Sequence, residues 1–466
     1  MAQTLDQTSF TRGEPSATPW KDYFLDLVQA PGRAKAALIG CFILMTLSPA
    51  GLSAMMPFVT ASFAAKTGRS MPEALLLFVA IPLLIAPFVL PIAGAWVDRW
   101  GARKVAVPAT ILYAAATALV PLSSGILWLF GLVIVLASIF GFMASLAVVF
   151  KVITGWFPRH RGIGFALIGT VSSLASAFLS PVFFALIGSP TAPASGLGWN
   201  GAYYVVAAWI AALAIPSAFF LLSEPDDGVA RIKSPVSAKP PTAADMRDVP
   251  GVALRKALRT RTWIFIAVSL ALAAAGPMSV RQNAVGFFGE RGFDAATVAV
   301  SQSVLFIASI VGLLSGGLMM DRARRPWIIV PIFAAVPLGL VLSYVNHGNL
   351  AVLFVANALL GFATGAESSL GPFLIARYFG LKCFAQIQGL TLAISTLFLG
   401  LSPFLVSAMQ MATGSYLVPF AALTVLTALA AVLAIFLPAY PSEWIHPGRP
   451  YRPTVPAAPE DFVRGH

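Results

Sequence analysis

The chain closes a long apolar run with the stretch Gly94-Ala95-Trp96-Val97-Asp98-Arg99-Trp100-Gly101-Ala102-Arg103-Lys104. A partial repeat of this stretch ends another apolar run: Gly317-Leu318-Met319-Met320-Asp321-Arg322-Ala323-Arg324-Arg325. Its aspartate lies 223 positions after Asp98. Each copy places an acid and several bases where an apolar helix would meet water. The recurrence suggests that the chain was built from two related halves.

Two further landmarks keep nearly the same spacing. Phe157 and Phe379 lie 222 positions apart, and so do Pro181 and Pro403, each of which follows a serine. Landmarks that share one offset across half a chain indicate an internal duplication. We therefore expect two pseudo-symmetric halves that form one body.

The composition indicates that lipid surrounds most of the chain. It is 58% hydrophobic and 10% charged, with a mean hydropathy of +0.84, whereas soluble domains carry roughly 25% charged residues. The apolar runs are continuous, which favours helices over alternating barrel strands. We predict an all-α membrane protein with 12 transmembrane helices, each long enough for a bilayer core of about 30 Å. These runs lie near 34–64, 73–97, 103–122, 126–156, 162–188, 200–222, 262–288, 295–319, 326–345, 350–377, 383–411 and 415–437.

The basic residues predict the orientation. With both termini in the cytoplasm, Lys66, Arg69 and Arg291 lie outside, and all other Lys and Arg lie inside or within spans. This orientation matches the positive-inside tendency. We expect a multi-pass protein of the cell (inner) membrane. The net charge of +12 is then a consequence of topology and of contact with anionic lipid. Nucleic-acid binding is disfavoured, because the bases are scattered over separate loops.

Five regions follow along the chain. We expect a cytoplasmic segment 1–33 without a signal peptide, a six-helix bundle 34–222, a proline-containing cytoplasmic linker 223–261, a second six-helix bundle 262–437 and a cytoplasmic tail 438–466. The two cysteines, Cys41 and Cys383, both lie toward the cytoplasmic side, where a structural disulfide is not expected, and metal-ligand spacing is absent. We expect no cofactor and no bound metal.

The sequence resembles the major facilitator superfamily. The pattern G-x-x-x-D-R-x-G-x-R-K at Gly94–Lys104 is similar to the loop between helices 2 and 3 of that superfamily, although the copy at Gly317–Arg325 lacks the second glycine. Two stretches look most like the monocarboxylate-porter and oxalate/formate-exchanger branch: Trp156–Gly162, and Gly365-Ala366-Glu367 followed by Ala376–Lys382. The resemblance implies two six-helix bundles around a central cavity that opens alternately to each side, and a small carboxylate-bearing substrate.

The repeated Asp-Arg loops suggest a gate. Asp98 at a helix end is expected to meet a helix N-terminus or a nearby base when the two bundles approach on the inside. Gly94 and Gly101 would permit close approach and a tight loop. We hypothesise that the two loops latch the cytoplasmic side; the alternative is that they are solvated topology anchors. The residues concerned are Gly94, Asp98, Arg99, Gly101, Arg103, Lys104, Asp321 and Arg322.

Glu367 is the first of three charged residues inside the predicted spans. A charge at mid-membrane costs at least about 2.5–3.5 kcal/mol, so it must face protein or water. Glu367 lies 12 residues before Phe379, about 18 Å from the cytoplasmic helix end. We hypothesise that it exchanges a proton on a polar cavity wall; the alternative is a protonated or hydrogen-bonded glutamate that joins two helices. The accompanying polar residues are Asn357, Thr364, Ser368 and Gln302.

Arg281 and Lys151 are the other two charges within spans. A guanidinium binds a carboxylate through two parallel hydrogen bonds, so Arg281 is a candidate anion receptor. The carboxylate-binding arginine of the resembled branch is generally on helix 8, which has none here, so monocarboxylate transport is in doubt. An outer-gate role explains Arg281 equally well. Lys151 either extends to the membrane surface, or acts as an inner cavity cation that attracts anions or pairs with an acid across the gate.

These features together predict a secondary active transporter. We expect it to move a small, monocarboxylate-like organic anion by alternating access, through proton symport or anion exchange. Within transport, the alternative is a proton-driven exporter of amphipathic compounds, with Glu367 as counter-ion. Outside transport, a membrane receptor or scaffold is possible. We expect no enzyme, because the sequence lacks a nucleophile–base or metal constellation.

Overall fold

The chain is helical throughout its described parts. The computed structural model describes residues 31–156, 161–189, 196–224, 251–322, 326–380 and 383–441, without the side chains of residues 154, 161–166, 317–318, 320–322 and 385. No β-sheet occurs in these ranges; one isolated β-bridge joins Gly251 and Gly380. The predictions for segments 1–30, 225–250 and 442–466 lie outside the described residues.

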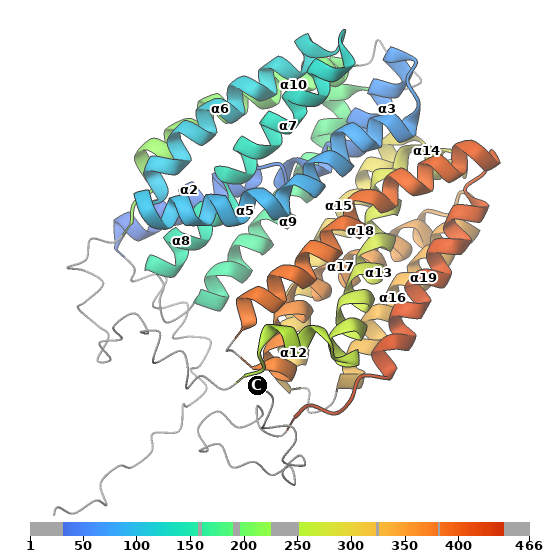
Figure 1. Ribbon diagram of the computed structural model, residues 1–466. Helices are drawn as coiled ribbons and strands as arrows, with labels where there is room; N and C mark the ends of the chain where they lie inside the picture. Colours follow the sequence, from blue (N-terminus) through green and yellow to red (C-terminus); the bar gives the residue numbers. More distant parts are fainter. Residues whose placement is uncertain are drawn as a thin grey trace, which may run out of the picture.

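The first half of the chain packs as one group of helices, drawn in blue to green in Figure 1. Its long helices α5 and α6 meet at Gly101, whose φ of +87° is readily adopted by glycine. The elements are α2 (Gly32–Thr46), η1 (Gly51–Ala54), α3 (Met56–Thr67), α4 (Met71–Leu75), η2 (Leu76–Ala80), α5 (Ile81–Trp100), α6 (Ala102–Ser123), α7 (Leu127–Met143), α8 (Leu146–Trp156), α9 (Arg161–Ile187), α10 (Gly198–Trp209), η4 (Ile210–Ala214) and η5 (Ser217–Leu221).

The second half forms a second group beside the first, drawn in yellow to red in Figure 1. A short helix, α12, precedes it and is joined to the end of α17 by the hydrogen bond from Val252 N to Phe379 O (2.9 Å). The elements are α12 (Leu254–Leu258), α13 (Arg261–Gln282), α14 (Ala284–Gly289), α15 (Ala295–Arg322), η7 (Pro326–Ile328), α16 (Ile329–Val345), α17 (Leu350–Phe379), α18 (Phe384–Thr413) and α19 (Leu417–Ile435).

Eleven helices in the described ranges are long and apolar enough to cross a membrane. The expected first span, 34–64, is not a single helix, because the chain breaks between α2 and α3. At the break Ser48 Oγ donates to Met45 O (2.7 Å) and accepts from Gly51 N (3.2 Å). A Cβ on Gly51 would lie 2.3 Å from Thr46 O, so this turn requires glycine. The count of twelve spans stays a prediction.

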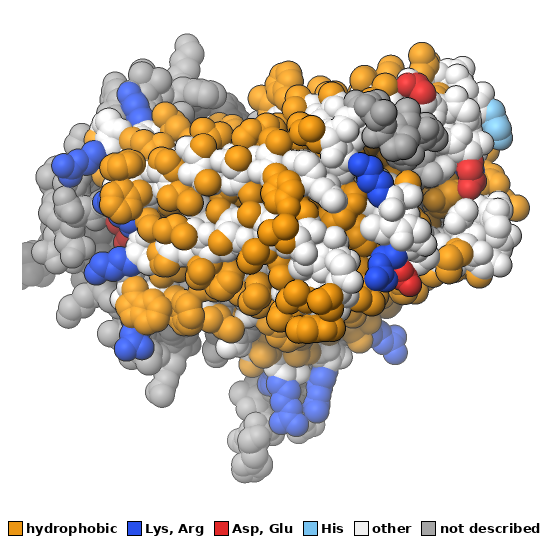
Figure 2. Space-filling model, turned by 90° about the horizontal axis from the view of Figure 1, so that it is seen from above, with side chains coloured by type: hydrophobic (Ala, Val, Ile, Leu, Met, Phe, Trp, Pro, Cys, Tyr) orange, Lys and Arg blue, Asp and Glu red, His pale blue; other side chains and the backbone are white. Residues whose placement is uncertain are grey.

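The outer surface of the helices is apolar. Phe88, Trp128 and Phe220 each expose more than 70% of their area. Figure 2 shows hydrophobic side chains over most of one face, with Lys and Arg toward its margins. A soluble protein rarely exposes so wide an apolar surface, so acyl chains are the natural solvent for it.

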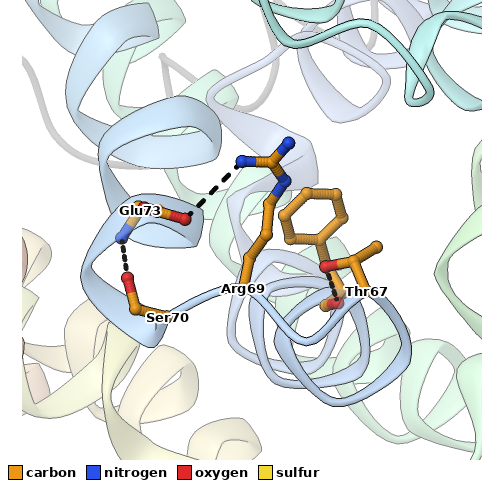
Figure 3. A network of polar contacts seen from close by, with 5 residues as sticks. Thr67, Arg69, Ser70 and Glu73 are labelled. Atoms are coloured by element: carbon orange, nitrogen blue, oxygen red, sulfur yellow. Dashed lines mark hydrogen bonds and ion pairs between the residues drawn. The ribbon is translucent and has the colours of Figure 1, made fainter.

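Polar residues define the turn from α3 to α4 (Figure 3). Gly68 has a φ of +69° and ends α3, and Ser70 begins α4 by accepting a hydrogen bond from Glu73 N (3.4 Å). Arg69 Nη1 lies 3.7 Å from Glu73 Oε2, and the Thr67 hydroxyl donates to a carbonyl one turn earlier. The left-handed glycine and the serine N-cap together reverse the chain within three residues.

The two bundles meet where α3 contacts α14, α9 packs on α15, and α18 packs on α5. Because Pro181 has no N–H, the carbonyl of Ala177 loses its usual intrahelical donor. Ser303 Oγ of α15 donates to that carbonyl (2.6 Å), and Ser180 Oγ donates in return to Ala299 O (3.2 Å). We call this reciprocal pair the serine clasp. It joins the two bundles through backbone acceptors.

Candidate functional site

A cavity of about 350 Å³ lies between the two bundles. The wall from the first bundle is mainly apolar, and the wall from the second bundle carries the charged groups. The apolar wall includes Met55, Met56, Phe78, Leu83, Ile134 and Phe142, and the opposite wall includes Pro277, Met278, Arg281, Gln282, Thr364 and Glu367. An apolar cavity with a few convergent polar groups is the usual form of a small-molecule site.

Arg281 reaches this cavity from the last turn of α13. Its Nη2 lies 2.9 Å from Met278 Sδ, and its guanidinium carbon lies 5.7 Å from the Phe306 ring centroid. Its Nε is buried without a hydrogen-bond partner, and within the described residues no carboxylate lies at ion-pair distance. A buried cation without a counter-ion is costly, so this guanidinium is suited to an anionic ligand.

The break after Arg281 is held by Asn283. Helix α13 contains Pro277 and ends at Gln282. The Asn283 amide donates to Ser279 O (3.0 Å) and to Pro403 O of α18 (3.2 Å). The second bond links the end of α13 to a neighbouring helix, which fixes the position of the guanidinium one turn before α14.

Glu367 is held by close contact between α15 and α17. A Cβ added to Gly312, Gly316, Gly361 or Gly365 would lie between 1.9 and 2.9 Å from backbone atoms of the facing helix. We call these four residues the glycine seam. Such small residues let membrane helices approach backbone to backbone. Glu367 follows the seam by two residues, at the cavity wall, and forms no ion pair or hydrogen bond among the described residues.

A second ionic group lies away from the cavity. Lys151 Nζ of α8 lies 2.6 Å from Asp98 Oδ1 at the end of α5, and the two side chains are 39% and 71% exposed. Neither residue lines the cavity. The pair lies within the first bundle, so in this conformation Asp98 is bound by its own half of the chain.

The comparisons with known proteins agree with this architecture. A family model described as Major Facilitator Superfamily matches residues 41–346. The chain belongs to the major facilitator superfamily. It is similar to the MFS transporter asaE of Aspergillus flavus, with 26% identity over 311 residues, which are 65% of each protein. The chain thus spans about two thirds of the length of this curated relative.

Solved structures show the same fold. A bacterial homolog of the human lysosomal transporter Spinster, in an inward-facing and unoccupied conformation, superposes with a TM-score of 0.59. It is 16% identical and the match covers 88% of this chain and 95% of that one. The prediction of a major facilitator superfamily member with an all-helical fold is therefore confirmed. The branch, the substrate and the coupling ion stay predictions.

Of the expected polar wall in this transporter, Thr364 and Glu367 line the cavity. The Thr364 hydroxyl donates to Leu360 O (2.8 Å), and the Ser368 hydroxyl donates to Gly365 O (2.6 Å). Asn357 and Gln302 are fully buried and lie outside the cavity lining. Asn357 Oδ1 and both polar atoms of Gln302 have no hydrogen-bond partner among the described residues.

The expected gating residues lie in two places, at the end of α5 with the start of α6, and at the end of α15. Arg99 lies over Trp100 (5.8 Å) and Arg103 over Phe219 (4.7 Å). Gly101 makes the tight turn that we expected, whereas a Cβ on Gly94 would meet no atom within 4 Å, so close approach is not needed there in this conformation. Lys104 is exposed. The side chains of Asp321 and Arg322 lie outside the description.

Two residues of this site, and one capping residue outside the cavity, were not predicted from the sequence. Tyr113 and Tyr203 line the cavity from the first bundle. The Glu224 carboxylate accepts a hydrogen bond from Ala102 N, at the first turn of α6. A tyrosine inside an apolar run is the signal that would have identified the first two, because a buried phenol needs a polar partner. The capping role of Glu224 has no signal in the local sequence.

Proposed function

We propose that this transporter carries a small organic anion, with Arg281 as the anion receptor. The observation that carries the proposal is the guanidinium at the cavity wall with no acid at ion-pair distance in the described chain. A substrate carboxylate would supply the missing counter-charge through two parallel hydrogen bonds. Substrate binding then gives the guanidinium a directly hydrogen-bonded counter-ion, which it lacks among the described residues.

Glu367 supplies the coupling in this proposal. With Arg281 charged and Glu367 ionised, the two residues contribute no net charge to the empty cavity. A bound anion would make the cavity negative, and a proton on Glu367 would restore neutrality. Net charge is costly in a low-dielectric site, so anion and proton are expected to bind together and cross together as symport. Neutral loaded and neutral empty states both permit alternating access.

We infer which side of the cavity is closed from the contacts at the two ends of the molecule. The serine clasp and the α3–α14 contact join the bundles at one end. The Asp98–Lys151 pair lies at the other end and stays within one bundle. We infer a state closed at the α3–α14 end, in which the proposed latch of Asp98 and Arg99 with Asp321 and Arg322 is released. In this proposal the protein lies in the cell (inner) membrane, and both of its termini face the cytoplasm.

An exporter of amphipathic cations is the second candidate. It is favoured by the apolar wall and by Glu367, which has no ionic partner among the described residues and would serve as counter-ion. Arg281 in the same cavity opposes it, because the guanidinium would repel the cation at short range. A competition assay with organic anions and organic cations separates the two proposals.

The test of the anion proposal is uptake by purified protein in proteoliposomes. Arg281→Gln is expected to lower carboxylate uptake at least about tenfold, and Arg281→Lys to retain part of it because the charge remains. Arg69→Gln is the matched control, since Arg69 lies in the α3–α4 turn and pairs there with Glu73. Undiminished uptake by Arg281→Gln, or competition by cations alone, would refute the proposal.

A further inference from the structure

The apolar wall of the cavity carries two tyrosines. Tyr113 of α6 and Tyr203 of α10 line the cavity, and their side chains are 7% and 8% exposed. Neither hydroxyl forms a hydrogen bond within the described parts of the chain. Tyrosine hydroxyls inside a protein normally find a polar partner, so two without a protein partner at a cavity wall point to a ligand.

Both rings are fixed by packing. Tyr203 lies 5.8 Å from Phe78 and 6.3 Å from Trp199, measured between ring centroids. Tyr113 packs on Gly141, where an added Cβ would lie 2.9 Å from the tyrosine ring. Because the rings are fixed, their hydroxyls are also held in fixed positions. Groups held in this way can select a ligand without a cost for ordering them on binding.

Two neighbouring hydroxyls on the same wall, those of Thr117 and Ser138, are already occupied, whereas the Ser53 hydroxyl forms no hydrogen bond within the described residues. Thr117 Oγ1 donates to the Tyr113 carbonyl (2.7 Å), and Ser138 Oγ donates to Ile134 O (2.7 Å). Their protons are thus directed along their own helices. The two phenols remain able to donate to a ligand and to accept from it.

The cavity volume indicates how large such a ligand is. A volume of about 350 Å³ lies within the ~300–1,000 Å³ range of small-molecule sites. A two-carbon or three-carbon acid would leave most of this space to water against an apolar wall. A substrate with about a dozen non-hydrogen atoms, acidic at one end and apolar along its body, would fill it.

We propose that Tyr113 and Tyr203 form a second recognition point, which binds a hydroxyl or carbonyl group at the far end of an amphipathic carboxylate held by Arg281. This inference rests on the proposed function, because the carboxylate is assigned to Arg281. It narrows the substrate class to organic acids with an apolar or aromatic body and a second polar group.

The test compares two probes, phenylpropanoate and para-hydroxyphenylpropanoate, as competitors for binding to the purified full-length transporter. Wild type is expected to prefer the hydroxylated probe by about tenfold, because a site that is built to hydrogen-bond discriminates against a ligand that lacks the group. Tyr113→Phe and Tyr203→Phe each reduce this ratio, and the double variant brings it close to unity. Affinity for phenylpropanoate stays unchanged in all three variants.

Tyr204→Phe is the matched control, since Tyr204 follows Tyr203 in α10 but is 43% exposed and does not line the cavity. A wild-type ratio near unity, or a ratio that the double variant keeps, would overturn the inference. If the ratio test fails in this way but both probes bind wild type and Arg281→Gln abolishes their binding, the inference is wrong and the proposed function still stands. If neither probe binds, or Arg281→Gln binds both normally, the inference and the proposed function fail together.

Discussion

Replacement of Gly365 by alanine tests how closely the glycine seam positions Glu367. The new Cβ would lie 1.9 Å from Ser309 O and 2.8 Å from Leu313 N, which are backbone atoms of α15 and cannot rotate away. Ordinary contact begins near 3.4 Å, so α15 and α17 must separate locally by about 1.5 Å. Overpacking of this kind costs about 1–3 kcal/mol, against a gain of at most about 1 kcal/mol from helix propensity.

The expected result is a lower unfolding temperature in detergent and weaker proton coupling, since Glu367 follows the displaced residue by two positions. Gly389→Ala in α18 is the control, because a Cβ there would meet no atom within 4 Å. The control should be as stable as wild type or slightly more stable. Equal unfolding temperatures and equal pH-driven uptake for the two variants would refute the reasoning.

Two further predictions concern the gate. Asp98→Asn removes an exposed ion pair worth about 0–1 kcal/mol, so stability should hardly change, whereas the lost latch should increase the labelling of cavity cysteines from the cytoplasm. Unchanged labelling together with unchanged transport would contradict the latch. Ser303→Ala leaves the Ala177 carbonyl without its donor, a loss of about 1 kcal/mol, and should shift the population about fivefold toward separation of α3 and α14. Spin-label distances between these helices measure that shift, and identical distributions would count against the clasp.

The helical architecture could be predicted because the apolar runs and the duplicated Asp-Arg loop are local features of the sequence. The broken first span shows where this reasoning stops. The sequence contains Gly51 and Ser48, but it does not show that they bond to each other. Their hydrogen bonds replace those of a continuous helix only because the chain turns back on Thr46. An apolar run of sufficient length therefore does not by itself indicate one uninterrupted helix.

The site was harder to predict, because its contacts connect distant parts of the chain. Charge inside an apolar run was enough to select Arg281 and Glu367, and the structure places both on one cavity wall. The bond from Lys151 to Asp98 spans 53 positions and depends on how α5 packs on α8. Tyr113 was overlooked, because a tyrosine in a membrane helix is equally compatible with the membrane interface, and its partners are set by packing.

The compensation of charge between Arg281 and Glu367 is tested most directly by Glu367→Gln in proteoliposomes. Net uptake of a carboxylate driven by a pH gradient should fall at least about tenfold, since the empty cavity then keeps one uncompensated positive charge and returns poorly. Exchange of labelled for unlabelled carboxylate should persist, because the loaded cavity is neutral without a proton. Pumping that survives the substitution, or exchange that is lost from a folded variant, would contradict the account.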